Sequence, residues 1–493
     1  MRKNRILMLL LVVCMIMATA TSCKGSEKTE SGGNVSVAGT DDASTEPGET
    51  PDDTTSDGGA VTGDDASTAP APPMVSTAPS NPNVAPTPVG FYDDIRGTTV
   101  KVYVSDKPDA LRVKRAESFE KEYGCKVEWN IVSWNTWHAK FAATVTSGKP
   151  IDVVPVNDTD FINYAAQALI QPIDSYIEYN DALWDRNVME LYTWRGKHYG
   201  MYMTWQQPDT SYIWYNKTMF EDAGVREPYD YYQKGEWNFE NFRKVAKEMT
   251  QDTNGDKTPD IYGFGTTQYF MFMMMNGNSV VSMANDGIKV TLDQPSAVPG
   301  LQILQDMQYK DHSMPINFSA DVHKGFPERK FAMILERGWH IIGVNDLYNK
   351  KVFPDDIGFC PPPKGPDAGD RYYAPTMMEA TGVSTGAKNP KGAAAWVYHS
   401  AAFNEKAKND PATVSARRKT ISDVHMKQAN DFLSKAVVIN TFSNGLGNWG
   451  AWNTGGQFLM MIDITKNNTP PATAISKYIG SLKSEVTSLN AKK

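Results

Sequence analysis

Side chains that carry oxygen atoms recur at alternate positions between residues 252 and 260. This spacing matches the first nine positions of a calcium-binding loop, because Ca²⁺ prefers oxygen ligands. Position six of such a loop is normally glycine and position twelve a bidentate glutamate, but here they are Lys257 and Gly263. The segment therefore predicts either a structural Ca²⁺ site or a plain turn rich in Asp and Asn, and we expect no other cofactor. The candidate ligands are Asp252, Asn254, Asp256, Thr258 and Asp260.

A second pattern could support covalent catalysis. Residues 382–386 read Gly-Val-Ser-Thr-Gly, which fits the nucleophile-elbow formula around Ser384, and Asp423 and His425 follow in the order found in hydrolases. An elbow of this kind needs a helix that starts directly after the serine. Here Asn389 and Pro390 come first, and the residue before a proline disfavours the helical conformation. The sequence therefore does not favour a serine hydrolase.

Other short enzyme motifs are absent or incomplete in the sequence. Residues 445–450 fit GxGxxG, but Gly455 and Gly456 follow where the helix of a dinucleotide site would run. The sequence has no HExxH and no Walker A motif, and its 7 histidines are scattered. Two carboxylates of a glycosidase can come from any acidic residues that meet in a fold, so that alternative stays open. We do not expect an enzyme.

Length and composition limit the classes that need to be considered. With 493 residues the chain is too long for one ordinary core, so two lobes or domains are expected. It has 49 basic against 57 acidic residues, which argues against a nucleic-acid partner because phosphates require clustered basic groups. The 12 Trp and 22 Tyr residues would suit the flat faces of sugars, but they would suit a core equally well.

The N-terminus is typical of an exported and lipid-modified protein. Three basic residues within residues 1–5 precede an apolar run over residues 6–17, which is too short to span a bilayer. Ala20, Thr21 and Ser22 then lead into Cys23. This stretch resembles a bacterial lipobox, although leucine is commoner at the position of Ala20. We therefore predict a signal peptide over residues 1–22 and a lipid on Cys23; a plain secretory signal is the alternative. No second long apolar span appears, so we expect attachment to the membrane by the lipid alone.

Two cysteines remain in the mature chain, Cys125 and Cys360, because Cys14 leaves with the signal and Cys23 takes the lipid. Two cysteines are too few for a disulfide framework. They can form a single bridge in an oxidising compartment or stay as two buried thiols.

A linker separates the lipid from the folded body. Residues 24–90 consist of Ser, Thr, Gly, Asp, Pro and Ala with few large apolar side chains. Such a segment cannot bury enough surface to offset the entropy of ordering it, so we predict a disordered tether over residues 23–90. Its root-mean-square reach would be on the order of 45 Å.

The folded part alternates between strand and helix patterns. β-rich segments separated by helical periodicity are typical of an α/β fold in which helices cover a mostly parallel sheet, and ligands of such sheets bind at the carboxyl ends of the strands. The predicted strands are 98–104, 126–132, 151–156, 201–205, 212–215 and 331–335, and the predicted helices are 111–123, 136–147, 240–249 and 393–403.

Eight segments resemble, in the same order, parts of the extracellular solute-binding proteins of ABC importers, the group that includes maltose-binding proteins. They are TSGKPIDVV (146–154), RGKHYGMYM (195–203), IWYNKTMFEDAGV (213–225), GEWNFENFRKVAKEMT (235–250), DTNGDKTPDIYGF (252–264), FPERKFAMILERGWH (326–340), IGFCPPPKGP (357–366) and GVSTGAKNPKGAAAWVYHSAA (382–402).

The resemblance implies two α/β lobes joined by crossing strands, with a ligand cleft between them. Lobe one would comprise residues 91–207 plus 357–383, and lobe two residues 208–356 plus 384–493. The crossings would fall near residues 206–211, 357–361 and 382–384.

The resemblance and the strand ends together indicate candidate ligand contacts. Trp339 follows the segment FAMILERG, where the family often places a tryptophan against a sugar ring; a core tryptophan is the alternative. Asn157 and Asp158 end a buried strand, where they could bind hydroxyl groups or cap the next helix. The remaining candidates lie at strand ends, at crossings or in the glycine-rich segment 443–456: Trp205, Asp209, Trp134, Tyr269, Glu379, Trp449 and Trp452.

The expected function is capture of a carbohydrate, with an oligosaccharide favoured, and its delivery to ABC permease subunits. The protein would act as a monomer on the outer or periplasmic face of the cell membrane, held there by its lipid. A surface carbohydrate-active hydrolase and a sensor or adhesin that does not take part in transport are the alternatives.

Overall fold

The computed structural model describes residues 75–76, 85–204, 209–316, 322–338, 341, 346–407, 422–451 and 454–492. All of them belong to one compact unit, Ala69–Lys493, and the description below concerns that unit. The predicted signal peptide and Cys23 lie outside the described residues. Within the predicted linker, Val75–Ser76 form a short strand, and the amide of Thr87 donates a hydrogen bond to Asp181 Oδ2 over 2.6 Å.

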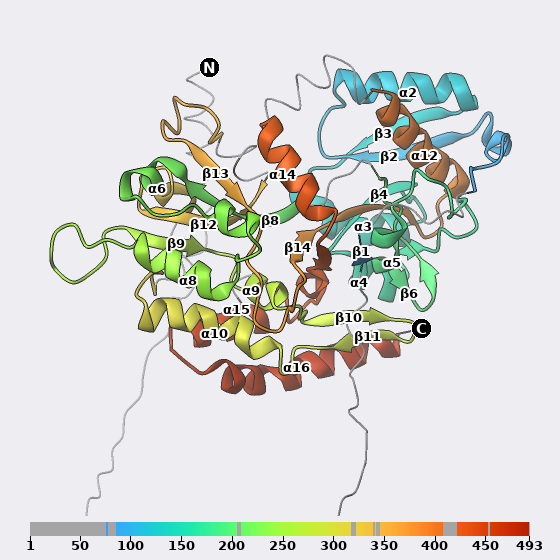
Figure 1. Ribbon diagram of the computed structural model, residues 1–493. Coiled ribbons are helices and arrows are strands. Elements are labelled where there is room, and N and C mark those ends of the chain that lie inside the picture. Colours follow the sequence, from blue (N-terminus) through green and yellow to red (C-terminus); the bar gives the residue numbers. More distant parts are fainter. Residues whose placement is uncertain are drawn as a thin grey trace, which may run out of the picture. The chain divides into compact units, whose positions relative to one another are not determined.

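The first sheet has five strands in the order β3-β2-β4-β15-β5 (Figure 1). Strands β2, β3 and β4 run parallel, whereas β15 runs antiparallel to both β4 and β5. We call this sheet and the helices α2, α3 and α12 the small lobe. Its strands are β2 (Thr99–Val104), β3 (Lys126–Ile131), β4 (Val153–Asn157), β5 (Ile170–Gln171) and β15 (Glu379–Ser384), and its helices are α2 (Ala110–Tyr123), α3 (Trp134–Thr146) and α12 (Pro390–Ala407).

Local sequence explains the ends of these elements. Asp109 caps α2 by accepting a hydrogen bond from the amide of Arg112, and Gly124 ends the helix with a φ of 65°, a left-handed conformation that glycine adopts without strain. A tight hairpin joins β6 (Thr193–Trp194) to β7 (Lys197–His198). Its two turn residues, Arg195 and Gly196, both have positive φ, as a two-residue turn between twisted strands requires.

The second sheet has seven strands, and we call it and the helices around it the large lobe. Strand β8 lies at its centre and runs antiparallel to β12, β13 and β14, while β9 is parallel to β12 and β16 to β14. The strands are β1 (Val75–Ser76), β8 (Asp209–Asn216), β9 (Tyr262–Thr266), β12 (Phe331–Arg337), β13 (Ile357–Cys360), β14 (Tyr373–Met377) and β16 (Val437–Asn440).

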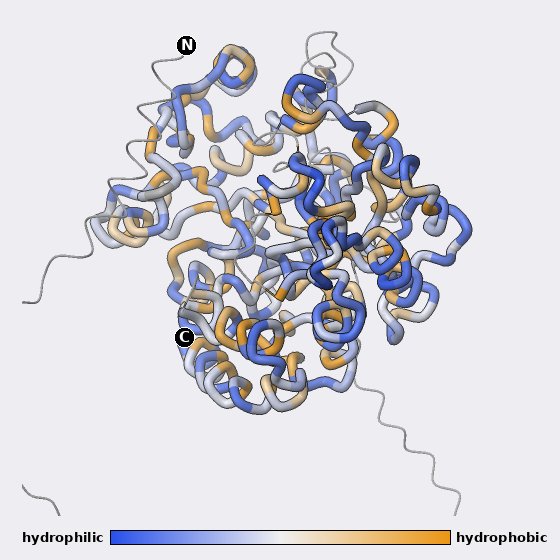
Figure 2. The backbone as a smooth tube through the Cα atoms, turned by 90° about the vertical axis from the view of Figure 1, so that its left-hand side faces the viewer, coloured by the Kyte–Doolittle hydropathy of each residue, from blue (hydrophilic) through white to orange (hydrophobic). Residues whose placement is uncertain are grey.

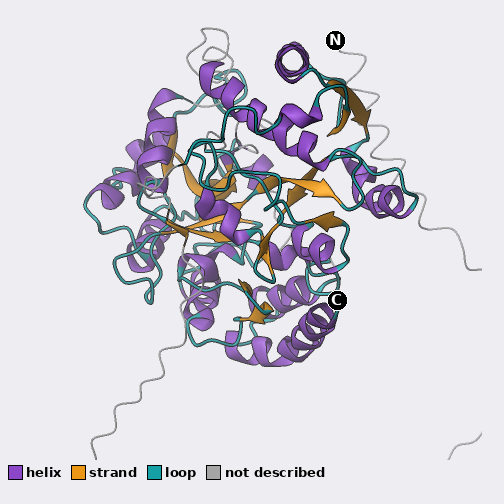
Figure 3. Ribbon diagram, turned by 90° about the vertical axis from the view of Figure 1, so that its right-hand side faces the viewer, coloured by secondary structure: helices purple, strands orange, loops and turns teal. Residues whose placement is uncertain are grey.

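Helices lie outside the strands in the views of Figures 1 and 3. Hydrophobic and hydrophilic residues alternate along many of them, as expected for elements that cover a core (Figure 2). None of the helices in the described ranges is both long and apolar enough to cross a membrane. The remaining elements are η1 (Asp93–Ile95), α4 (Phe161–Ala166), α5 (Arg186–Leu191), α6 (Lys217–Ala223), α7 (Pro228–Gln233), α8 (Phe239–Glu248), α9 (Met271–Met275), α10 (Ala297–Gln305), η2 (Asp306–Lys310), α11 (Val322–Gly325), α14 (Asp423–Leu433), η4 (Phe442–Gly445), α15 (Gly456–Thr465), α16 (Pro471–Ala491) and the hairpin β10 (Val281–Ala284) and β11 (Gly287–Val290).

Membership of the two sheets differs from the predicted lobes at two places. Strands β13 and β14 belong to the large sheet, although residues 357–383 were predicted in lobe one. The chain changes sheets between Met377 and Glu379, and the predicted crossings near 357–361 and 382–384 are therefore wrong. Strand β8 begins at Asp209, which agrees with the predicted first crossing near 206–211.

Helix α12 packs against β2 and β15 of the small lobe, although residues 384–493 were predicted in lobe two. Hydrogen bonds fix the start of the helix there. The buried carboxylate of Asp152 accepts from the amides of Lys388 and Asn389, and Asn389 Nδ2 donates to Thr98 Oγ1 over 2.6 Å. These contacts involve polar side chains far apart in the sequence, which strand and helix periodicity cannot reveal.

Most of the predicted strands and helices of the small lobe are confirmed, including β2, α2, β3, α3 and β4, with ends that shift by one or two residues. Cys125 and Cys360 are both buried and free, so the alternative of two buried thiols holds for them.

Candidate functional site

The carboxyl ends of the small-lobe strands bring several predicted residues together. Strand β4 ends at Asn157, and its antiparallel neighbour β15 begins at Glu379, which is paired with Asn157 in the sheet. Strand β3 leads directly into α3, whose first residue is Trp134. Because β2, β3 and β4 are parallel, Trp134, Asn157 and Glu379 lie at the same edge of this sheet.

Trp134 and Glu379 line a hollow of about 260 Å³ together with Tyr103. The Trp134 side chain is 37% exposed, and its ring lies 6.5 Å from that of Tyr103 and 5.1 Å from that of His138. Glu379 is open to solvent, yet loss of hydration raises its pKa, and the charge of Asp160 adds to the shift.

Two further groups stabilise this edge. Burial, followed by the charge of Glu379, raises the pKa of Tyr103 to about 12, so its hydroxyl remains a neutral hydrogen-bond donor. His138 Nδ1 lies 2.7 Å from Asp160 Oδ1, and this hydrogen bond raises the pKa of the histidine. Because His138 follows Trp134 by four residues on α3, the contact with Asp160 helps to hold the helix end that carries the tryptophan.

Asn157 and Asp158 use their side chains within the protein. Asn157 Oδ1 accepts hydrogen bonds from the amide and the hydroxyl of Thr159, over 3.0 and 2.6 Å, which forms a turn before α4. Asp158 is fully buried, and its Oδ2 accepts a hydrogen bond from Thr441 of the large lobe. Burial raises the pKa of Asp158 to about 7, against the opposing effects of the Thr441 bond and the Arg337 charge. The hydrogen bond between Asp158 and Thr441 therefore joins the lobes.

The large lobe presents a second hollow at the corresponding edge of its sheet. Strands β9, β12, β14 and β16 run in one direction, and their last residues, or those directly after, line a pocket of about 380 Å³. Much of its wall is apolar. The aromatic rings are Tyr269, Phe270 and Phe458, and the thioethers are those of Met271, Met273, Met274, Met377 and Met461.

A buried carboxylate fixes the polar side of this pocket. Glu336 is 1% exposed; its Oε1 accepts from Gln268 Nε2 and its Oε2 interacts with His323 Nε2, both over 2.6 Å. Gln268 Oε1 in turn accepts from the hydroxyl of Ser211 over 2.6 Å. The network orients Gln268 and the loop that carries Tyr269, so both positions in the wall are set by side chains of the sheet.

Arg337 provides the positive charge of the pocket. Its side chain is 17% exposed, its Nη1 donates a hydrogen bond to Met377 Sδ, and the same nitrogen lies 3.9 Å from Asp209 Oδ2. Asp209 begins β8 at the first crossing, and Met377 ends β14 just before the chain changes sheets again. Arg337 thus contacts both crossing segments, and a change in their relative position would change its environment.

Each hollow has a wall residue in the segment Met377–Glu379, where the chain changes sheets; we call this segment the second crossing. Met377 lines the large-lobe pocket, and Glu379, two residues later, lines the small-lobe hollow. Between them, the carbonyl of Met378 accepts a hydrogen bond from the buried Tyr192 hydroxyl over 2.8 Å. One short segment thus carries the walls of both hollows, an arrangement suited to a ligand that contacts both lobes.

The sequence matches the family model for bacterial extracellular solute-binding proteins over residues 95–408, more than half of the chain. The chain belongs to this family. The match confirms the resemblance of the eight segments, whereas no curated protein has a significant sequence match.

Three solved structures of other binding proteins share the fold. They are an ABC substrate-binding protein from Listeria monocytogenes in complex with cycloalternan, the GacH receptor of Streptomyces glaucescens, solved unliganded and with acarbose, and UgpB from Mycobacterium tuberculosis in complex with glycerophosphocholine. Their identities to this chain are 16%, 19% and 14%, and each has a TM-score of 0.55. The matches cover 79–80% of this chain and 98% of each of the others. The two-lobed α/β fold is therefore confirmed.

The other predicted contacts of this solute-binding protein have different surroundings. Tyr269 is 3% exposed and lines the large-lobe pocket. Trp449 is 1% exposed, because its ring packs in the core against Gly456, where a Cβ atom would come within 2.8 Å of the ring. Trp449 is thus a core residue, which corrects its prediction as a ligand contact. Trp339, Trp205 and Trp452 lie outside the described residues.

Sequence reasoning missed several residues of the pocket. Arg337 was missed because it ends a strand whose pattern indicated only burial. The run Met271–Met275 was missed because its spacing does not indicate a binding site. Gln268 matters through side-chain bonds to residues 57 and 68 positions away in the sequence. The signal that could have found Arg337 is its place at the carboxyl end of a buried strand, two residues before Trp339.

The predicted calcium loop uses its oxygen atoms locally. Asp252 accepts hydrogen bonds from the amides of Asn254, Gly255 and Lys257, and Asp260 accepts from Thr253 and Asn254. Among the described residues, no group of three or more His, Cys, Asp or Glu side chains is placed to hold a metal ion. These bonds are those of an Asx-rich turn, and the Ca²⁺ site remains a prediction.

The nucleophile-elbow residues lie in different parts of the solute-binding protein. Ser384 is fully buried at the end of β15, and its hydroxyl donates to the carbonyl of Ile151. His425 lies on α14 against β13 of the large sheet, hydrogen-bonded to Tyr348, and burial lowers its pKa to about 4. A buried serine in the small sheet and a histidine beside the large sheet do not form a catalytic arrangement.

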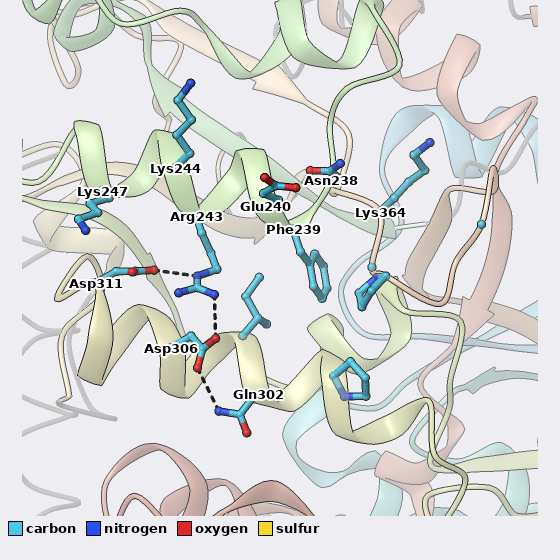
Figure 4. A pocket seen from close by; sticks show the side chains of 15 residues that line it. Asn238, Phe239, Glu240, Arg243, Lys244, Lys247, Gln302, Asp306, Asp311 and Lys364 are labelled. Carbon is cyan, nitrogen blue, oxygen red and sulfur yellow. Dashed lines mark hydrogen bonds and ion pairs between the residues drawn. The ribbon is translucent and has the colours of Figure 1, made fainter.

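A third cavity, of about 770 Å³, lies between α8 and α10 of the large lobe (Figure 4). Arg243 reaches across it, with Nη1 2.7 Å from Asp306 Oδ2 and Nε 2.7 Å from Asp311 Oδ2. Lys244 and Lys247 point away from these ion pairs (Figure 4). None of the residues predicted as ligand contacts lines this cavity, and it is not at the strand ends.

Proposed function

We propose that this solute-binding protein captures a carbohydrate, specifically an oligosaccharide, between its lobes and delivers it to an ABC permease. The observation that carries the proposal is the half-exposed ring of Trp134 beside the Tyr103 hydroxyl and the Glu379 carboxylate. Sugars present apolar C–H faces and a rim of hydroxyl groups, so a flat ring next to hydrogen-bonding groups suits them.

The ligand size follows from the two hollows. They lie on either side of the crossing at Met377 and Glu379, so a ligand that fills both must extend past this segment. An oligosaccharide that carries a further group at one end has that shape. Cycloalternan and acarbose, found in two of the similar structures, are saccharides, but glycerophosphocholine in the third is not. The carbohydrate proposal therefore rests on the residues more than on the fold.

We further propose that a lipid on Cys23 holds the protein on the outer or periplasmic face of the cell membrane, and that residues 24–74, which precede β1, act as a tether. A monomer on such a tether can reach permease subunits in the same membrane. Replacing Cys23 by Ser would prevent lipid attachment, and the protein would then appear in the soluble fraction. Retention of the Cys23→Ser variant in the membrane would contradict the anchor.

A screen of sugars by thermal unfolding tests capture. A ligand that binds only the folded form stabilises it, by about 2.7 kcal/mol at a concentration 100 times its Kd. At least one oligosaccharide should raise the unfolding temperature in a saturable way and should be recovered unchanged by chromatography. Catalytic hydrolysis would instead support the carbohydrate-active hydrolase. A sensor or adhesin would be supported by a different result. In that case the ligand would bind saturably, but its uptake by the cell would not depend on an ABC permease.

A further inference from the structure

The large-lobe pocket has an unusual wall for a sugar site. Five methionines line it: Met271, Met273, Met274, Met377 and Met461. They come from α9, from the end of β14 and from α15, so three separate elements contribute thioethers to one space. Thioether side chains are apolar, flexible and polarisable, and they adapt to the shape of an apolar group.

Several of the polar side chains around this space are already engaged by the protein. Gln268 is bonded to Ser211 and Glu336, Thr441 donates to Asp158, and Asn444 Oδ1 accepts from Gln457 Nε2 over 3.1 Å. A ring of sugar hydroxyls placed here would lose its water without gaining enough partners, which is unfavourable. The pocket therefore suits a mainly apolar group.

One acceptor in the wall has no partner within the described part of the chain. Gln457 Oε1 is buried and receives no hydrogen bond from the described residues, although Gln457 Nε2 is engaged with Asn444. A buried oxygen without a donor costs free energy unless a ligand or water supplies one. A single hydroxyl on an otherwise apolar ligand group would meet this requirement.

The pocket is also placed to share a ligand with the small-lobe hollow. Met377 belongs to its wall, and Glu379, two residues later in the same crossing segment, belongs to the hollow that we assign to the sugar. Its volume of about 380 Å³ is at the lower end of the range of roughly 300–1,000 Å³ for small-molecule sites. That space would accommodate a substituent of about one or two rings.

We propose that the methionine pocket binds an aromatic substituent of the captured carbohydrate, so that the ligand is an aryl glycoside and not a free sugar. The proposal rests on the proposed capture of a carbohydrate. Aromatic substituents fit better than alkyl chains because sulfur atoms make favourable contacts with ring edges and because Tyr269, Phe270 and Phe458 can pack against a flat ring. A phenolic hydroxyl on the substituent would donate to Gln457 Oε1.

The first experiment uses an aromatic probe without any sugar. 4-Methylumbelliferone has a flat fused ring and one phenolic hydroxyl, and its binding can be followed by fluorescence. A drug-like efficiency of about −0.3 kcal/mol per non-hydrogen atom gives a Kd on the order of 1 mM for this probe. Saturable binding near that concentration is expected, and it should be lost when the pocket is filled.

The second experiment compares matched glycosides. The 4-nitrophenyl and methyl β-glycosides of glucose, galactose, mannose and xylose differ only in the group that the pocket would receive. For any sugar that binds, the aryl glycoside should bind at least tenfold more tightly than the methyl glycoside. Equal affinities of the two forms would overturn the aryl proposal while leaving carbohydrate capture intact.

Ala451→Trp fills the pocket, because Ala451 is one of its half-buried wall residues. It should abolish the aryl preference, so that the aryl and methyl glycosides bind with equal affinity. Met377→Gln keeps the length and half-exposed position of the side chain and should reduce the preference several-fold, which covers the case that Ala451→Trp does not fold. The control is Ala472→Trp, which places the same ring at an exposed position of α16.

The two proposals fail in different ways. If the umbelliferone probe binds and Ala451→Trp removes it, but no glycoside or oligosaccharide binds, the pocket assignment holds as a site for an aromatic group and carbohydrate capture fails. If glycosides bind and the aryl preference survives in both pocket variants, the pocket assignment is overturned. Failure of every probe would overturn both.

Discussion

The two hollows beside the second crossing offer a ligand different chemistry. On the small-lobe side, the wall carries an exposed indole ring and groups whose pKa values are raised, such as Glu379 and Tyr103. On the large-lobe side, several of the polar groups are bonded within the protein and methionines supply much of the surface. One half of the site is therefore suited to hydroxyl groups and the other to apolar contact.

This difference follows from how each sheet edge is built. In the small lobe, Glu379 begins an antiparallel strand beside the end of β4, so its side chain lies at the edge of the sheet and lines the hollow. In the large lobe, Glu336 is one residue from the end of β12 and is buried under His323 and Gln268. A shift of one or two positions along a strand thus separates a carboxylate available to a ligand from one that only supports the wall.

The largest effect is expected for Asp158→Asn, because Asp158 joins the two sides as a buried acid. Its pKa of about 7 in the folded protein exceeds the ordinary value near 3.9 of the unfolded chain. The folded form therefore holds a proton that the unfolded form loses, and stability falls as the pH rises from about 4 to 7. Asn cannot ionise, so the variant avoids this loss, which amounts to about 3–4 kcal/mol for the full shift.

Unfolding temperatures of both proteins between pH 4 and 8 measure this effect. The unfolding temperature of the variant minus that of the wild type should increase as the pH rises to about 7 and then level off. A difference that stays constant over this range would show that Asp158 has an ordinary pKa and does not couple the lobes through a buried acid. Thr441→Val, which removes the hydrogen-bond donor but not the acid, should keep the pH dependence.

Trp134→Ala tests the small-lobe side directly. Loss of a stacking ring should weaken binding of the best oligosaccharide by roughly 10- to 100-fold, because contacts of this kind contribute about 1–3 kcal/mol. Titration calorimetry with wild type and variant gives the ratio. Leu111→Ala, at a residue of α2 that is 40% exposed, is the control and should leave the affinity unchanged. An unchanged affinity in Trp134→Ala would show that this ring does not contact the ligand. The small-lobe hollow would then no longer be a candidate sugar site.

Sequence patterns predicted the elements of the small lobe well because they depend on local features. The alternation in 98–104 and the cap at Asp109 act within a few residues. Membership of a sheet depends on distant partners. Strand β13 was placed in the wrong lobe because its pairing with Tyr215 and Trp214 of β8 has no counterpart in its own four residues.

The site was predicted less completely than the fold, and the reason is again distance along the chain. Trp134 was predicted because strand ends can be read from periodicity, whereas Glu379 was predicted because the family resemblance implied a crossing just after it. Trp449 looked equally exposed in a glycine-rich segment, but those glycines let backbone and ring pack closely in the core. Arg337 and Gln268 are defined by the residues that hold them, and those contacts form only in the folded chain.

Glu379→Gln should have a smaller effect than loss of the ring. If the carboxylate accepts hydrogen bonds from ligand hydroxyls, the neutral amide should weaken binding by about 3- to 10-fold at pH 7, as expected for the difference between charged and neutral hydrogen bonds. Loss of hydration raises the pKa of Glu379, so wild-type affinity should begin to fall at a pH above the ordinary value of 4.5 as the group takes up a proton. Affinity of the Gln variant should not fall in that range, and a parallel fall in both proteins would assign the titration elsewhere.

The smallest effect is expected for calcium, which tests whether the large lobe carries an ionic site away from its sheet edge. The carboxylates of Asp252 and Asp260 accept hydrogen bonds from the loop itself, so a cation would have to compete with bonds already made. Millimolar Ca²⁺ against a chelator should then change the unfolding temperature by less than about 1 °C, which corresponds to less than about 1 kcal/mol for a folded part of this size. Asp260→Asn, which removes the charge but keeps one oxygen to accept from Thr253, should behave like the wild type. A saturable rise in the unfolding temperature that Asp260→Asn abolishes would establish a calcium site in this loop.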